Sequence, residues 1–131
     1  MIASITTNAP AEDDAELISA WATYNQARAN YDAAPDEGPY IDGNNAFERE
    51  QLDIMEPVEK QIADATPMTL RGVEIQLWAM LVHAADTQDA AILARTENLD
   101  ACPDHFDWIH THALNAIRAI RAIGAAKGGA K

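Results

Sequence analysis

Apolar side chains recur along this chain at the spacing of three and four residues that is typical of helices, and the pattern predicts four main helical segments. The first runs from Pro10 to Ala34, and Pro35 ends it. Acidic residues in its first turn suit the positive end of the helix dipole. Its apolar face consists of Leu17, Trp21, Tyr24 and Tyr31.

A loop rich in proline, glycine and asparagine follows, and Asp42-Gly43 within it has the composition of a tight turn. Asn45 and Glu48 have the spacing of a capping box, in which each side chain accepts a hydrogen bond from the other residue's backbone. This pair predicts a second helix from Asn45 to Ala65. Its predicted buried stripe is Phe47, Ile54, Val58 and Ile62, supported by Leu52 and Met55.

Pro57 falls inside the second helix and removes one backbone hydrogen bond. We expect either a kink near Asp53 or two short helices that meet there. We favour the kink, because the apolar stripe keeps its phase across the proline.

The third helix follows a sharp corner at Pro67, and Thr69 is placed to cap it. From Val73 to Ala85 the segment is apolar almost all round, which is typical of the buried centre of a bundle. One narrow stripe differs, and it consists of Gly72, Gln76, Ala79 and His83. It is interpreted either as the solvent side of the helix or as a shallow groove where a second helix approaches the backbone at Gly72.

A short connecting helix, capped near Asp86, is expected to run through Arg95, and Asn98 to Pro103 reads as a loop. The last helix is predicted from Asp104 to Gly124. Its expected core face is Phe106, Ile109, Ala113, Ala116, Ile117, Ile120 and Ile123. Trp108 lies outside this arc, so it either covers a second neighbour inside the bundle or anchors a contact with another chain.

These segments predict an all-α helical bundle with a long helix hairpin, a central apolar helix, a short connecting helix and a long C-terminal helix. The length of 131 residues and a hydrophobic content of 48% suit one domain, which we place at residues 10–124. Residues 1–9 and 125–131 are expected to be flexible ends. No internal repeat and no strand-like alternation is found in the sequence.

Charge is distributed unevenly along the chain. Twenty-one acidic and nine basic residues give a formal charge of −12, which argues against binding nucleic acid or anionic membranes. Residues 1–66 hold 14 acids and 3 bases (−11), and residues 67–131 hold 7 acids and 6 bases (−1). The acidic first half either keeps the protein soluble, contacts a basic partner, or mimics nucleic acid.

The single cysteine, Cys102, allows no internal disulfide. The sequence shows no apolar run long enough to span a bilayer and no signal-peptide pattern at its start. We therefore expect a cytoplasmic protein with no membrane contact.

Cys102, His105, His110 and His112 superficially resemble a set of zinc ligands. On a helix, however, His105 and His112 would stand roughly 10 Å apart, and His110 would point about 140° away from His105. No third group accompanies Cys102 as in a nucleophilic triad. We therefore expect no metal, no cofactor and no catalytic residues.

The segment from Ile62 to Val73 resembles an element found in small helical proteins of alphaproteobacteria, many of them encoded near prophage-like genes. Pro67, Thr69 and Gly72 carry this resemblance, whereas Gln76 stands where a lysine often follows. The resemblance implies a small helical protein and brings no activity that could be transferred.

The sequence thus favours a non-catalytic protein-interaction or structural helical module that forms a homodimer through its third and last helices. Its candidate interaction surface is Gly72, Gln76, His83 and Trp108. One alternative is an acidic inhibitor that mimics nucleic acid. The other is a small metal-binding protein or enzyme that uses the His105, His110 and His112 region.

Overall fold

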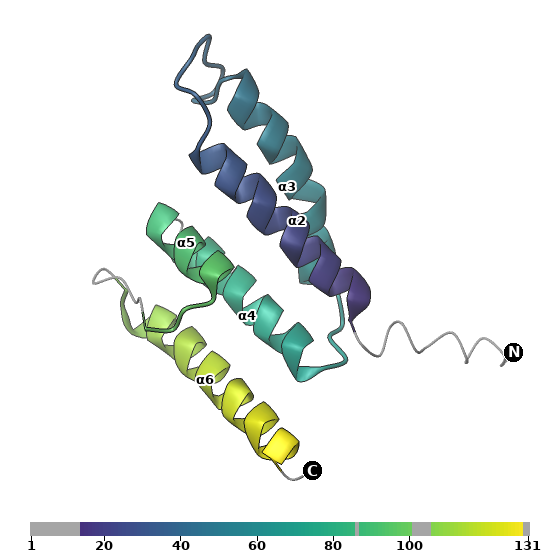
Figure 1. Cartoon of the computed structure of the whole chain (residues 1–131). Coiled ribbons are helices and arrows are strands. Elements are labelled where there is room, and N and C mark those ends of the chain that lie inside the picture. Colours follow the sequence, from purple (N-terminus) through teal and green to yellow (C-terminus); the bar gives the residue numbers. More distant parts are fainter. Residues whose placement is uncertain (1–13, 86, 101–105, 130–131) are drawn as a thin grey trace, which may run out of the picture.

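Five helices make up the described part of the chain (Figure 1). They are α2 (Ala15–Asp32), α3 (Ala46–Asp64), α4 (Leu70–Ala85), α5 (Gln88–Thr96) and α6 (Trp108–Gly129). The computed structural model describes residues 14–85, 87–100 and 106–129, and these ranges contain no strand. The predicted all-α bundle is confirmed. None of these helices is long and apolar enough to cross a membrane.

Helices α2 and α3 form an antiparallel hairpin, and its local signals were read correctly from the sequence (Figure 1). Asp42 and Gly43 both have positive φ angles, 53° and 85°, and Ile41 and Asn44 exchange backbone hydrogen bonds across the predicted tight turn. The capping box of Asn45 and Glu48 is present, with both hydrogen bonds at 2.9 Å.

The start of the first helix was predicted too early. Asp14 has a left-handed backbone conformation with φ of 57°, and α2 begins at Ala15. Helical geometry therefore cannot run through Asp14. Residues 10–13 and the expected flexible end at 1–9 lie outside the described residues.

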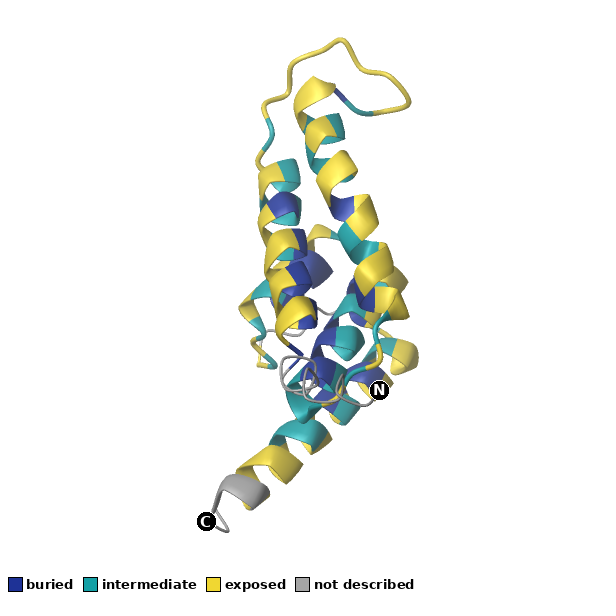
Figure 2. Cartoon of the chain, turned by 90° about the vertical axis from the view of Figure 1, so that its right-hand side faces the viewer, coloured by how far each residue is buried: buried dark blue, intermediate teal, exposed yellow. Residues whose placement is uncertain are grey.

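Helix α3 is continuous through Pro57, so the alternative of two short helices is wrong. The predicted stripe is only partly right. Met55 and Ile62 are buried, whereas Phe47 and Ile54 are exposed. The end of the hairpin next to the turn projects beyond the other helices (Figure 2), and there α2 alone among the described helices covers the start of α3.

Helix α4 is the centre of the bundle, as predicted, because α2, α3, α5 and α6 all pack against it. Ile75, Trp78 and Leu81 on this helix have no solvent exposure. Figure 2 shows the buried residues gathered where the helices meet. The predicted short helix is α5, and the Oγ1 of Thr87 accepts a hydrogen bond from the backbone N–H of Ala90 at its start.

Helix α6 differs from the prediction at both ends and in the face that it buries. It begins at Trp108, after non-helical residues 106 and 107, and continues past Gly124 to Gly129. Residues 125–129 are therefore helical, where a flexible tail was expected.

The core face of α6 is rotated from the predicted arc. Leu114, predicted to lie outside it, is buried with Ala113 and Ile117, whereas Ile109 and Ile123 are about half exposed. Among the described helices α6 packs against α4 alone, and one neighbour covers a narrower strip than the predicted arc. Trp108 is 70% exposed, so the interpretation that it covers a neighbour inside the bundle is wrong.

Candidate functional site

The four residues of the predicted stripe on α4 have different surroundings. Gly72 is buried, Gln76 and Ala79 are half-buried, and His83 is exposed. The interpretation of the whole stripe as a solvent side is therefore wrong, because two other helices approach it. The contacts of these two helices explain the surroundings of each stripe residue.

Asp14 covers Gly72 and holds the first turn of α4. Its carboxylate accepts hydrogen bonds from the backbone N–H groups of Met68 and Thr69, each at 2.9 Å, and from the Thr69 hydroxyl at 2.5 Å. The same hydroxyl oxygen accepts from the N–H of Gly72 at 3.0 Å. A side chain at position 72 would overlap the Asp14 carboxylate, so glycine is required there.

These contacts also set the charge state of Asp14. Burial by itself would raise the pKa of the carboxyl, but hydrogen bonds from the Thr69 hydroxyl and from the N–H groups of Met68 and Thr69 hold the pKa below its ordinary value. The element formed by Pro67, Thr69 and Gly72 thus has a structural role as the docking point of the residue that precedes α2.

Gln76 closes the end of α3. Its amide nitrogen donates to the carbonyl oxygens of Ile62 and Ala65, at 2.9 and 2.8 Å. Carbonyl groups at the end of a helix have no N–H donor within the helix itself. Gln76 therefore fixes the crossing of α3 over α4 and is not a free interaction residue.

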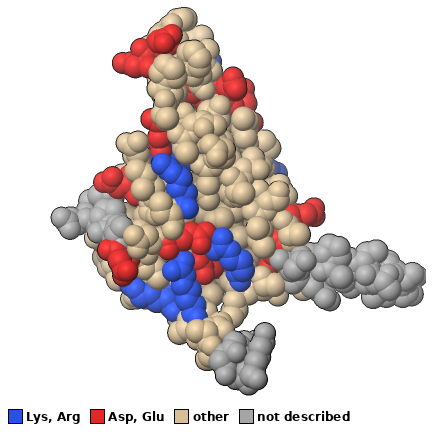
Figure 3. Space-filling view, in the orientation of Figure 1, with Lys and Arg blue, Asp and Glu red and all other residues tan. Residues whose placement is uncertain are grey.

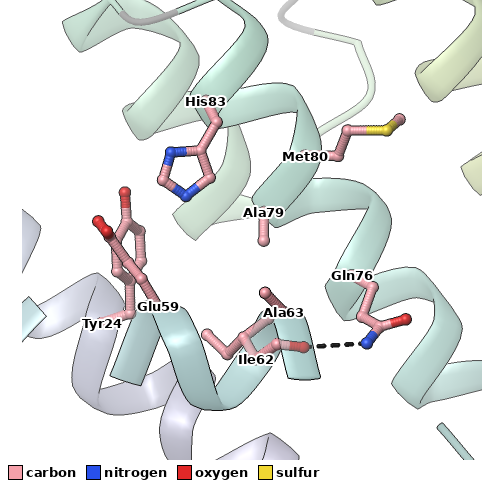
Figure 4. Close-up of a pocket in the computed structure, with 8 residues that line it drawn as sticks. All are labelled: Tyr24, Glu59, Ile62, Ala63, Gln76, Ala79, Met80 and His83. Atoms are coloured by element: carbon pink, nitrogen blue, oxygen red, sulfur yellow. Dashed lines mark hydrogen bonds between the residues drawn. The ribbon is translucent and has the colours of Figure 1, made fainter. Parts of the chain in front are cut away.

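Beside this crossing lies a pocket of about 260 Å³, which we call the α3–α4 pocket (Figure 4). Its polar lining comes from Tyr24, Glu59, Gln76 and His83, and its apolar lining from Ile62, Ala63, Ala79 and Met80. Tyr24 is held in place by stacking on Trp21, with ring centroids 5.8 Å apart and planes 5° from parallel. Two of the predicted surface residues, Gln76 and His83, thus line one pocket.

Glu59 is the acidic group of this pocket. Within the described part of the chain its carboxylate has no hydrogen bond or ion pair. Burial raises the pKa of the Glu59 carboxyl above its ordinary value, although His83 and Arg28 act in the opposite direction. The pocket therefore contains a partly desolvated carboxylate with spare hydrogen-bonding capacity.

A network of charged side chains joins α4, α6 and the end of α5 on the side of the molecule seen in Figure 3. Glu74, only 6% exposed, accepts hydrogen bonds from Arg121 at 2.9 Å and from the Trp78 indole at 3.0 Å. Burial opposes ionisation of Glu74, but Arg121 and the Trp78 N–H lower its pKa below the ordinary value.

The same network continues to Glu97 just after α5. Arg71 donates to both carboxylate oxygens of Glu97, at 2.9 and 2.8 Å, and the Trp21 indole donates to it at 3.1 Å. The Arg121 guanidinium also lies 5.9 Å from the centre of the Trp78 ring. Because carboxylates of the chain occupy both guanidinium groups, this cluster stabilises the bundle and does not form an open anion site.

The sequence did not predict this network. Arg71, Glu74 and Trp78 share one side of α4 by their spacing, which was the available signal. Their partners Glu97 and Arg121, however, come from segments far along the chain.

The opposite side of the α4–α6 pair is apolar. We define the α4–α6 face as Val73, Leu77, Met80 and Ala84 of α4 together with Ile109, Ala116, Ile120 and Ile123 of α6. Helices α4 and α6 are antiparallel (Figure 1), and the contact of Arg121 with Glu74 places the charged network on one side of the pair. By helical spacing, the apolar stripes of both helices then lie on the other side. Met80, Ile109 and Ile123 are each about half exposed.

The predicted histidine and cysteine region is only partly described, because Cys102 and His105 lie outside the described residues. His110 accepts a hydrogen bond from the Asp107 N–H at 3.0 Å, and His112 contacts the edge of Trp108. Among the residues that the structure describes, no three His, Cys, Asp or Glu side chains are grouped so that they could hold a metal ion.

Several acids of the α2–α3 hairpin have partners within the chain. Asp32 pairs with Arg28 and Arg95, and Asp64 pairs with Lys60. On the face shown in Figure 3 the acidic side chains are dispersed and do not form a stripe. The structure therefore gives the nucleic-acid-mimic alternative no continuous acidic surface on that face.

Comparisons with known proteins add no assignment. No protein-family model matches the chain, and no curated protein or solved structure is significantly similar to it. The geometry of the molecule is the basis for any functional proposal.

Proposed function

We propose that this protein is a non-catalytic protein-interaction module whose interaction surface is the α4–α6 face, and that its partner is a second copy of the same chain. The observation that carries the proposal is a stripe of apolar, partly exposed residues on one side of a helix pair whose other side bears the charged network. Contiguous exposed apolar surface of this kind marks interaction sites.

The geometry of the face suits a symmetric pair. Two antiparallel helices from each copy would form a four-helix bundle about a two-fold axis, the commonest closed arrangement of identical chains. In such a dimer the same surface of both copies meets, so Met80, Ile109 and Ile123 would be buried against the α4–α6 face of the second copy. Trp108, at the start of α6, would lie at the rim of the contact and could add to it.

The available area agrees with a weak dimer. The residues of the α4–α6 face run from Val73 to Ala84 on α4 and from Ile109 to Ile123 on α6. At about 1.5 Å per residue and about 10 Å width per helix, the face covers roughly 400 Å² per copy in projection, or about 800 Å² for two copies. Because this area lies at the low end for protein complexes, we expect a weak dimer that dissociates on dilution and not an obligate one.

The distribution of charge also favours contact through this side. Residues 67–131 carry a formal charge of only −1, whereas residues 1–66 carry −11. Two copies that meet through α4 and α6 keep their acidic α2–α3 hairpins outside the contact, where solvent screens the repulsion.

The polar residues of the described interior support an interaction module over an enzyme. Asp14, Asn45 and Glu74 are the buried polar residues there, and each is occupied by helix capping or by the charged network. Groups held in this way stabilise the fold and are not poised to react with a substrate.

Sedimentation equilibrium at protein concentrations around 10 µM tests the proposal, because association depends on concentration. We expect a mass near twice 14.2 kDa that falls toward 14.2 kDa on dilution. Ile123→Glu should abolish the dimer while the helical circular dichroism spectrum stays unchanged. Ile92→Glu on α5 is the matched control, since Ile92 is 39% exposed and Ile123 is 50% exposed, and it should leave the dimer intact.

A wild-type mass of 14.2 kDa at all concentrations tested would overturn the homodimer. A dimer that Ile92→Glu breaks and Ile123→Glu does not would place the interface elsewhere and would overturn the assignment of the α4–α6 face.

A further inference from the structure

We infer that the α3–α4 pocket binds a small organic cation, a primary or quaternary amine with a short apolar body. The inference does not require the dimer, because it rests on the shape, charge and aromatic wall of the pocket in one chain, although Met80 belongs both to the pocket lining and to the α4–α6 face.

The pocket exists because two small side chains face each other across the crossing of α3 and α4. Ala63 on α3 and Ala79 on α4 point toward one another in Figure 4, while Ile62 and Met80 bound the apolar part. The resulting volume of about 260 Å³ lies just below the range of roughly 300–1,000 Å³ found for drug-sized ligands. A ligand with few heavy atoms is therefore the appropriate size.

The charge of the lining selects the ligand. Glu59 is the only acidic residue among those that line the pocket, and no lysine or arginine is present there. Arg28 lines an adjoining hollow together with Glu59, and its Nε donates to Asp32 at 3.2 Å. Within the described chain the Glu59 carboxylate interacts with His83 and Arg28 only through longer-range electrostatics, so an ammonium group would give it a hydrogen-bonded partner.

The aromatic wall favours the same ligand. Tyr24 lines the pocket and is immobilised by its stacking on Trp21. The face of a phenol ring attracts cations, and this attraction is strongest where water is excluded. A carboxylate and an aromatic ring beside an apolar floor form the arrangement that recognises an alkylammonium ion.

The test uses three small probes of similar size with the full-length protein: butylammonium, 1-butanol and butyrate. Titrations are followed by changes in the amide NMR spectrum. We expect saturable shifts at Ala79 and His83 with butylammonium in the millimolar range, and affinities at least tenfold lower for the neutral and anionic probes.

Two variants connect the binding to the pocket. Glu59→Gln keeps the shape and removes the charge, so it should weaken butylammonium binding at least tenfold. Ala63→Leu should fill the cavity and abolish binding. Glu50→Gln is the matched control, because Glu50 is an exposed acid on the same helix that does not line the pocket, and it should bind as the wild type does.

Several results would overturn the inference: no saturable shift with butylammonium, equal affinity for 1-butanol, or equal loss in Glu50→Gln and Glu59→Gln. Tenfold tighter binding of an N-acetyl-lysine methylamide would also overturn it, since the site would then recognise a lysine residue of another protein. The titration is repeated in Ile123→Glu, so that a failure of binding and a failure of the proposed dimer are distinguished.

Discussion

At the scale of single residues, the described chain depends on a few polar groups that act between helices. Asp14 precedes α2 and caps the start of α4, and Gln76 donates hydrogen bonds to the end of α3. Such groups supply partners to backbone atoms at helix ends, which would otherwise be buried without a hydrogen bond. Their effect is to fix how the helices are placed relative to each other.

Gly72→Ala tests the contact between Asp14 and α4. Alanine in place of a helical glycine usually stabilises a protein, by about 1 kcal/mol. At position 72 the new methyl group would overlap the Asp14 carboxylate and crowd Pro67. We expect a loss of about 1–3 kcal/mol in the free energy of unfolding, measured in urea.

Gly124→Ala is the control for that experiment. The nearest side-chain atom to a methyl group there is the Cδ1 of Leu70 at 3.8 Å, an ordinary contact. This variant should be stabilised by about 1 kcal/mol. If both glycine variants gained stability equally, Asp14 would not be held against α4.

The lowered pKa of Asp14 predicts an acid-sensitive contact. A carboxyl whose pKa is lower in the folded than in the unfolded state contributes stability above its unfolded pKa, and this contribution is lost as the pH falls through the folded pKa. Asp14→Asn removes this titration. Urea unfolding at a series of pH values should therefore show a difference between wild type and Asp14→Asn that is greatest near pH 7 and shrinks in acid.

At neutral pH this difference is expected to be about 1–2 kcal/mol, the usual cost of losing a capping group. A difference that stayed constant down to the most acidic folded condition would contradict the assigned role of the carboxylate. Asp53→Asn, at an exposed residue of α3, is the matched comparison for the pH profile.

At the scale of elements, the number of covering neighbours decides which side of a helix is buried. Helix α4 has four neighbours and buries most of its circumference, whereas α6 has one among the described helices. An apolar arc therefore becomes core on α4 and partly exposed surface on α6. The same principle leaves Phe47 exposed at the projecting end of the hairpin.

Trp78→Ala tests the central position of α4. The Trp78 side chain is fully buried and its indole N–H donates to Glu74. Its removal should cost about 3–5 kcal/mol in the free energy of unfolding, from lost apolar burial and from the cavity. Trp108→Ala, at a residue that is 70% exposed, should change monomer stability by less than about 0.5 kcal/mol. Equal effects of the two changes would contradict a central α4.

At the scale of the whole molecule, the formal charge is concentrated in the first half of the chain, away from the α4–α6 face. The α2–α3 hairpin belongs to the strongly acidic half of the chain, and the exposed apolar residues of the α4–α6 face belong to the nearly neutral half. This separation lets a protein of charge −12 remain dispersed while one side is available for contact.

The proposed dimer should therefore respond to salt in a particular direction. Each copy carries −12, and the eight residues that define the α4–α6 face are uncharged, so we expect salt to screen repulsion without weakening an attractive ion pair. Between about 0.05 M and about 0.5 M NaCl we expect the dimer dissociation constant to fall by roughly two- to tenfold. Sedimentation at several salt concentrations measures this, and weaker association in salt would indicate a contact held by ion pairs.

Features that depend only on neighbouring residues could be predicted from the sequence. The turn at Asp42-Gly43, the capping box at Asn45, the cap at Thr87 and the buried character of α4 follow from side chains within one or two helical turns of each other. Such signals need no knowledge of the rest of the fold. The helical class of the protein follows from them.

The tertiary structure alone decided which faces are buried and which distant groups meet. Asp14 lies 55 residues from Thr69 in the chain, and Glu74 lies 47 residues from Arg121. The core face of α6 is set by α4, its single neighbour among the described helices, and the α3–α4 pocket by the crossing of two helices. Periodicity shows that a helix has an apolar side, but the helices packed against it select the part of that side that is buried.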